Sequence, residues 1–245
     1  LLFLTPLLTN IPRAGLAAVV ISAVLTLFHP TQVFKLWKIN RDDGIVAVTV
    51  FILALLTKPD YALLIGVMIS LIFFFWKTMH PRIVEITKDP EYNIFTNADE
   101  TGKPGCPQIL HLRSDNVIFF ANAEYTIEHI LERVEAVSTP LKFLLMNFQA
   151  VGFIDITGID ELRQLKEELQ AKGIQLAFFD VHQPVMKTFH SSGFSDEMKT
   201  GGMIEQTDLT SRQGKALSEL FKKIDHDYCR NKCPYKLFYE CATIK

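Results

Sequence analysis

Four residues near the C-terminal end have side chains suited to metal chemistry: His226, Cys229, Cys233 and Cys241. Structural zinc sites use two close pairs of cysteine or histidine ligands at short, regular spacing. The spacing here matches no such pairs, so we expect no metal and predict reduced thiols. The four cysteines of the chain, which include Cys106, are too few and too scattered in 245 residues for a disulfide framework, and this favours a reducing compartment.

Other residues with catalytic potential lack the context that catalysis needs. His190 stands beside Ser191 and Ser192, but no strand-elbow motif presents a serine and no orienting acid is identifiable. The pair Gly201-Gly202 lacks the lysine and the spacing of a phosphate-binding loop. We therefore predict that the protein is not an enzyme and uses no cofactor.

A strand, a tight turn and a helix follow one another between Leu144 and Gly173. Phe143 to Met146 form an unbroken apolar run, which predicts a strand buried on both faces. The helix after the turn carries one apolar stripe, made of Ile159, Leu162, Leu165 and Leu169. Its start resembles a capping box of Thr157 and Asp160, Glu168 and Lys172 are spaced as an i,i+4 ion pair, and Gly173 can end it.

The turn Phe153-Ile154-Asp155-Ile156-Thr157-Gly158 resembles the central turn of a STAS domain. In the anti-sigma-factor antagonists of that family, an Asp-Ser-Ser/Thr-Gly turn carries a phosphorylatable serine in second place. That place is Ile156 here, so the resemblance implies the geometry without the phosphorylation switch. We identify Asp155, Ile156, Thr157 and Gly158 as the candidate regulatory or partner-binding turn. The alternative is that they are helix caps and turn formers alone.

The first 80 residues are predicted to lie in a membrane. The chain is 49% hydrophobic with a mean hydropathy of +0.18, and three apolar runs, 14–28, 45–56 and 61–76, follow the apolar start at 1–8. Each run is shorter than the ~20 residues of an ideal crossing, so tilt or packing within a larger bundle is implied. The alternative is that they are buried helices of a soluble protein, although they have no polar face to present to water.

Basic residues indicate the orientation of these helices. Lys35, Lys38 and Arg41 lie in the polar link between two runs, and Lys77, Arg82 and Lys88 follow the last one. Three crossings place both groups on one side, which the positive-inside rule assigns to the cytoplasm. We therefore predict a multi-pass protein of the cell (inner) membrane with the residues after about 80 in the cytoplasm. The near-neutral net charge of -2 and the absence of a basic stripe give no reason to expect nucleic-acid binding.

The remainder is predicted to be an α/β domain with a mixed sheet and helices packed on it. Residues 81–108 are expected to be a linker, and 109–225 the domain. Within it, 109–113 and 117–121 are expected to form a hairpin, 127–137 a helix, 174–181 a strand, and 184–193 a short helix that ends at Gly193. Residues 226–245 are a tail rich in Cys, aromatic and basic residues, either a solvated helix or a contact with the anionic inner leaflet or a neighbouring subunit.

Together the motifs resemble the sulfate permease (SulP) family of anion transporters. Asn10 to Ala18 is similar to a helix start of that family, Lys58 to Ser70 to its last membrane helix, and Phe119 to Tyr125 to the first strand–helix junction of its STAS domain. The resemblance implies that the chain supplies the last helices of an inverted-repeat membrane domain, with a longer membrane region before Leu1, followed by a cytoplasmic STAS domain. The helix N-termini that would hold the anion lie elsewhere in such a fold, so no substrate-binding residue is expected in this chain.

The resemblance implies secondary active transport of an inorganic anion (sulfate, bicarbonate or a related ion) or a small carboxylate, with the STAS domain serving regulation or assembly. The expected partners are the anion, the lipid bilayer, a second copy in a homodimer and a cytoplasmic protein at the STAS domain. The alternative function is a membrane-anchored STAS regulatory module without transport activity.

Overall fold

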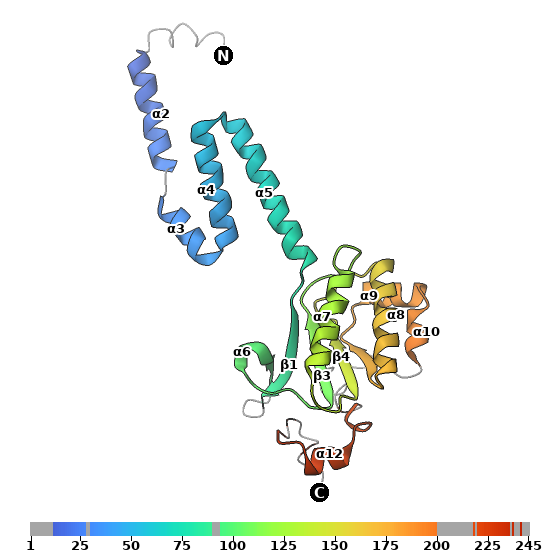
Figure 1. Cartoon of the computed structure of the whole chain (residues 1–245). Helices are drawn as coiled ribbons and strands as arrows, with labels where there is room; N and C mark the ends of the chain where they lie inside the picture. The colour runs from blue at the N-terminus through green and yellow to red at the C-terminus, as the bar shows by residue number, and fades with distance from the viewer. Residues whose placement is uncertain are drawn as a thin grey trace. The chain divides into compact units, whose positions relative to one another are not determined.

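The computed structural model describes residues 12–27, 30–89, 94–199, 218, 220–235, 237 and 241. The expected helix end at 1–8 and the pair Gly201-Gly202 fall outside these residues. Of the run from Asn10 to Ala18, only Asn10 and Ile11 fall outside them. The chain divides into two compact units, Leu1–Phe75 and Trp76–Lys245, which Figure 1 shows as the helices α2 to α5 and the α/β domain.

The first unit is helical: α2 (Arg13–Leu27), α3 (Pro30–Ile39), α4 (Arg41–Leu56) and α5 (Pro59–Met79). Apolar side chains are exposed on α4, on α5 and on the part of α2 whose side chains the structure describes, as expected for helices with a lipid-facing surface. Among the described helices, α5 alone has the length and hydropathy to cross a bilayer, and Arg13–Ala23 is a shorter apolar segment. The 16 residues of α4 fall below the ~20 of an ideal span.

The polar link between the first two apolar runs contains a helix, which was not predicted from the sequence. This helix, α3, carries Lys35 and Lys38 together with the half-exposed Trp37. Trp37 packs on Gly44 of α4, where an added Cβ would lie 2.7 Å from the indole ring. Glycine is therefore required where the two helices approach. The link was missed because its apolar positions follow a helical period over only 10 residues.

The second unit contains a five-stranded sheet in the order β2-β1-β3-β4-β5. The strands are β1 (Ile83–Asp89), β2 (Ile94–Asn97), β3 (Ile109–Ser114), β4 (Phe143–Asn147) and β5 (Gln175–Phe179). β1 is antiparallel to β2 and to β3, while β3, β4 and β5 are parallel. The predicted mixed sheet is confirmed.

The segment 81–108 is part of this sheet, and the prediction of a linker there was wrong. It contains β1, β2 and the short helix α6 (Ala98–Thr101). The predicted hairpin was wrong as well, because the antiparallel partner of β3 is β1: Ile83 pairs with Ser114 and Glu85 with Leu112. Residues 117–121 form no strand, and Ile118 makes only an isolated parallel bridge to Ile154.

The helices α7 (Ala123–Ala136), α8 (Ile156–Ala171), α9 (Gln183–Ser191) and α10 (Phe194–Lys199) follow the parallel strands, and Figure 1 shows them grouped on one side of the sheet. Their apolar stripes and one face of the sheet form the main core, which includes Ile130, Leu144, Leu165 and Phe178, all fully buried. Gly173 and Gly193 end α8 and α9 at φ values of 72° and 77°, as predicted.

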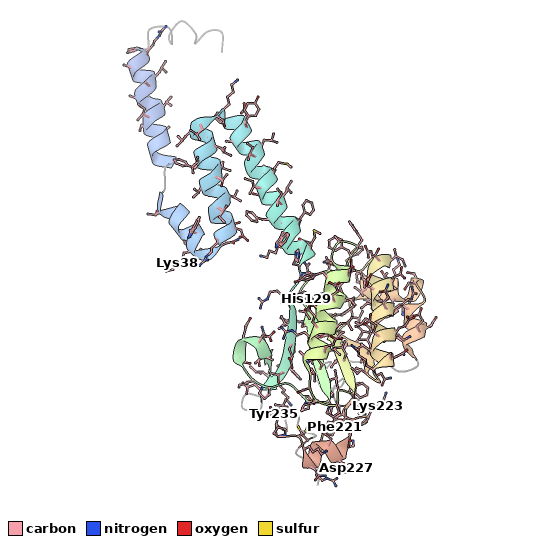
Figure 2. All side chains as sticks on the ribbon, in the orientation of Figure 1. Lys38, His129, Phe221, Lys223, Asp227 and Tyr235 are labelled. Atoms are coloured by element: carbon pink, nitrogen blue, oxygen red, sulfur yellow. The ribbon has the colours of Figure 1, made fainter. Side chains whose placement is uncertain are left out.

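A second apolar cluster covers the opposite face of the sheet. Ile109, Phe143, Leu145, Ala177 and Phe179 contribute from the strands, and the C-terminal segment contributes Leu220, Phe221, Ile224, Cys229 and Cys241. The segment includes α12 (His226–Asn231). Figure 2 labels Phe221 beside the strands and Asp227 farther from them. The tail is therefore not a solvated helix, because its buried residues are part of the core of the domain.

Candidate functional site

The turn between β4 and α8 is built on the carboxylate of Asp155. Asp155 is the N-cap of α8, and its Oδ1 accepts a hydrogen bond from the backbone N–H of Gly158 at 2.8 Å. Its Oδ2 accepts a second one from the backbone N–H of Phe120 at 2.8 Å. The helix therefore begins two residues earlier than the predicted pair of Thr157 and Asp160 implied, and one side chain joins two loops.

Gly158 is needed because α8 starts against two buried isoleucines. A Cβ on Gly158 would lie 2.7 Å from Cγ1 of Ile154 and 3.0 Å from Cγ2 of Ile118. These two isoleucines belong to the parallel bridge that brings the segment before α7 beside the turn. Only a residue without a side chain permits this close approach.

Three large apolar side chains are exposed at this end of the sheet. Phe120 is 74% exposed, Phe153 is 53% exposed and Ile156 is 61% exposed. The hydrogen bond from Phe120 to Asp155 and the bridge from Ile118 to Ile154 place the three residues on neighbouring chain segments. We refer to Phe120, Phe153 and Ile156 as the apolar patch. The turn was identified from the sequence, but Phe120 was missed. Residues 117–121 were predicted to be a strand, and the structure has Phe120 in a loop.

Carboxylates lie on the first two turns of the helices that follow the two loops of the apolar patch. They are Glu124 and Glu128 of α7 and Asp160 and Glu161 of α8. Partial burial raises the pKa of Glu161, and the charges of Glu124, Asp160 and Glu128 raise it further, so the four carboxylates repel one another. Asp160 is paired with Arg163 at 2.8 Å. Within the described ranges, no lysine or arginine forms an ion pair with the other three.

Asn122 connects the same loop to the end of α5. Its side chain is buried, with 1% exposure, and its Oδ1 accepts a hydrogen bond from the N–H of Phe119 at 2.9 Å. Its Nδ2 donates to the carbonyl oxygens of Val117 at 2.9 Å and Thr78 at 3.0 Å. Both polar atoms of this side chain are therefore used: two hydrogen bonds fix the loop before α7, and the third fixes the last turn of α5 to that loop.

Aromatic rings strengthen this junction. The ring of His80 stacks on Trp76 at 4.3 Å and meets Tyr125 edge-on at 4.7 Å, and Tyr125 lies 4.0 Å from the ring of His129. Figure 2 labels His129 on its helix. The contacts run from the end of α5 along one side of α7. Hydrogen bonds thus link Thr78 to Asn122 and Asn122 to Phe119, and the next residue, Phe120, is bonded to Asp155.

The cysteines do not form a reactive site. Burial raises the pKa of Cys106 to about 12 and that of Cys229 to about 11, which leaves both as thiols near neutral pH. None of the four cysteines, all of which the structure describes, is in a disulfide. The described residues contain no group of three or more His, Cys, Asp or Glu side chains arranged to hold a metal ion. The structure thus gives these thiols a packing role.

Comparison with known proteins places this geometry in a family. The STAS domain family matches residues 99–207. Sulfate transporter 1.3 of Arabidopsis thaliana is 32% identical over 205 residues, which are 80% of this chain and 31% of that protein. High affinity sulfate transporter 2 of Stylosanthes hamata is 28% identical over a stretch of the same length. The chain carries a STAS domain and is similar to sulfate transporters, as the resemblance to the sulfate permease (SulP) family implied.

The solved structures support the same fold for this chain. The murine Solute Carrier 26 family member A9 anion transporter in the inward-facing state superposes with a TM-score of 0.69 over 88% of this chain and 34% of that one, at 18% identity. The chain spans about a third of the length of the curated relatives it matches. These relatives are named as transporters.

Proposed function

We propose that this chain is part of a secondary active transporter that moves an inorganic anion such as sulfate or bicarbonate, or a small carboxylate. The observation that carries the proposal is the match to sulfate transporters across 80% of the chain, through both the helices and the STAS domain. No residue of this chain is assigned to the anion. Its helices act as the gate against which an anion-carrying core moves, and the STAS domain regulates or assembles the transporter.

The contacts at the end of α5 support a regulatory role for the STAS domain. Asn122 fastens the backbone of Thr78 to the domain, and its loop neighbour Phe120 is held by Asp155. A partner bound at the turn can therefore act on the last turn of a membrane helix through four residues. In this proposal Asp155 and Gly158 shape the turn. Ile156 and the adjacent Thr157 make the contact with the partner.

The topology belongs to the same proposal. Residues after about 80 lie in the cytoplasm, since the basic residues of α3 and those after α5 share one side. The protein works as a homodimer. Cysteines introduced at exposed positions such as Glu168 should react with a membrane-impermeant maleimide only after the cells are opened.

Flux measurements on the reconstituted whole protein test the transport proposal. Liposomes containing it should take up radiolabelled sulfate, or should exchange it for bicarbonate, chloride or a dicarboxylate, above protein-free liposomes. The chain of 245 residues alone should give no flux, because it spans a third of its relatives. No flux of any of these anions in either direction would contradict transport.

A membrane-anchored STAS module is the second candidate, and one observation favours it. Among the described helices only Pro59–Met79 is long and apolar enough to span a bilayer by itself. In that case the module should retain every partner interaction when expressed with α5 as its only membrane helix, and the whole protein should move no anion.

A further inference from the structure

The apolar patch and the carboxylates beside it form one surface with a definite chemistry. Phe120, Phe153 and Ile156 are each more than half exposed. Exposed apolar clusters of this kind mark contact sites more often than scattered single residues do. The surface lies on loops held by Asp155 and Asn122, so the three side chains are presented on a fixed backbone.

The charges decide which partner fits this surface. Glu124, Glu128 and Glu161 stand one or two helical turns from the patch and have no cation among the ion pairs of the described chain. The negative charge of the three glutamates repels the anionic inner leaflet and nucleic acid. Lysine and arginine side chains of a partner would lower the repulsion among these carboxylates. A partner that fits this surface has an apolar face bordered by basic residues, and a basic amphipathic helix has such a face.

We propose that the apolar patch, with Glu124, Glu128 and Glu161 at its border, binds a basic amphipathic helix of a cytoplasmic protein. The apolar face of that helix covers Phe120, Phe153 and Ile156, and its lysines or arginines pair with the three glutamates. This deepens the proposed partner-binding role of the turn and does not depend on anion flux. Binding is strongest at low ionic strength, because Glu124 and Glu128 are exposed and Glu161 is only partly buried.

Peptide binding to the whole chain tests this proposal. The chain is placed in nanodiscs of zwitterionic lipid, and the probe is a fluorescent 18-residue helical peptide with leucine on one face and lysine on the other. Fluorescence anisotropy should give at least 10-fold tighter binding than to empty nanodiscs. A peptide with glutamate in place of lysine is the matched probe, and it should bind at least 10-fold more weakly.

Three sets of substitutions assign the binding to the surface. The double variant Phe120→Ser and Ile156→Ser and the triple variant Glu124→Gln, Glu128→Gln and Glu161→Gln should each weaken binding at least 10-fold. The control, Glu167→Gln with Glu168→Gln, removes exposed carboxylates farther along α8 and should change it less than twofold. Unchanged melting temperatures show that the variants are folded.

Several outcomes would overturn the proposal. These are equal binding of the lysine and glutamate peptides, patch variants within twofold of the unsubstituted chain, and no binding above that of empty nanodiscs. If the unsubstituted chain self-associates and the Phe120→Ser, Ile156→Ser variant does not, the occupant is a second copy. Competition by anionic but not zwitterionic vesicles identifies a lipid surface. None of these results bears on sulfate flux, so the two proposals fail separately.

Discussion

Oδ2 of Asp155 lies 2.8 Å from the backbone nitrogen of Phe120, while Oδ1 of the same carboxylate caps α8 through Gly158. The residue that starts the helix therefore also fixes the loop that carries the most exposed phenylalanine of the patch. A substitution at this one position should change both the stability of the helix and the presentation of the patch.

Replacing Asp155 by Ala should destabilise the STAS domain by about 1–3 kcal/mol, because one cap and one loop hydrogen bond are lost together. Asp155→Asn keeps one acceptor oxygen and should cost less. Chemical denaturation of the chain in nanodiscs measures the difference. Asp160→Ala, which removes only a half-exposed ion pair with Arg163, is the control and should cost less than about 1 kcal/mol. An Asp155→Ala effect no larger than this control would show that the carboxylate does not hold the two loops.

Asn122→Asp should loosen the end of α5 while preserving the shape of the side chain. The Oδ1 acceptor for Phe119 remains, but both hydrogen bonds from Nδ2, to Val117 and to Thr78, are lost, and a charge is left in a buried site. Hydrogen exchange should become faster in residues 76–82 and 117–123, with little change in β4 and β5. Asn116→Asp in the same loop is the matched control. Equal protection of 76–82 in both variants would exclude the proposed link.

Gln108→Leu should release the C-terminal segment from the sheet. The side chain of Gln108 exchanges two hydrogen bonds with the backbone of Asp225, each 2.9 Å long, and its Nε2 lies 3.1 Å from Sγ of Cys229. Their loss takes the partner from the backbone N–H of Asp225, while its carbonyl keeps the bond from the N–H of Cys229, and should cost about 1–3 kcal/mol. The rate at which a thiol reagent modifies Cys229 should rise several-fold. The exposed Gln164→Leu should leave this rate unchanged, and an equal rate for both variants would mean that Gln108 does not anchor the tail.

Acid should destabilise the domain through His111. This residue is 4% exposed between Phe95 and Phe179, its Nε2 has no hydrogen-bond partner, and burial with help from Arg113 lowers its pKa from 6.5 to about 3. The unfolded chain therefore binds a proton below pH 6.5 that the folded chain does not bind. The stability is fully present above that pH and is lost as the pH falls toward 3.

Between pH 7.5 and pH 5 this single group should remove about 2 kcal/mol from the free energy of unfolding. His111→Leu should reduce the pH dependence by that amount, whatever it does to the stability at pH 7.5. Urea denaturation at the two pH values measures it. His190→Leu is the control. It also removes a histidine, but that ring is hydrogen-bonded to Ser195 at 2.8 Å, unlike Nε2 of His111. The same pH dependence before and after the change at His111 would contradict the assignment.

Gly66→Ala should separate α4 from α5. A Cβ at this position would lie 2.3 Å from Cγ2 of Val50, closer than any contact between folded side chains. The overpacking should cost about 1–3 kcal/mol, and the added substitution Val50→Ala should restore part of it. Thermal unfolding in nanodiscs provides the measurement. Gly15→Ala in α2, where the nearest atom is 3.9 Å away, should have no such effect. No rescue by Val50→Ala would show that the two residues do not meet.

The local elements of this protein were determined by the sequence itself. The apolar runs, the strand at 143–146, the amphipathic helix after the turn and the stops at Gly173 and Gly193 depend on patterns within a few residues, and the structure has them. Local periodicity reports which face of a segment is apolar, so such elements can be recognised without knowledge of their neighbours.

Only the tertiary structure decided which segments meet. The apolar pattern of 83–89 is interrupted by charges, and it becomes a strand because it pairs with β3, about 30 positions along the chain. Phe120 and Asp155 are joined across 35 positions, and Gln108 and Cys229 across 121. Hydrogen bonds between such distant residues depend on register and closure of the whole sheet, which no local pattern specifies, and for this reason the turn was found from the sequence while the surface around it was not.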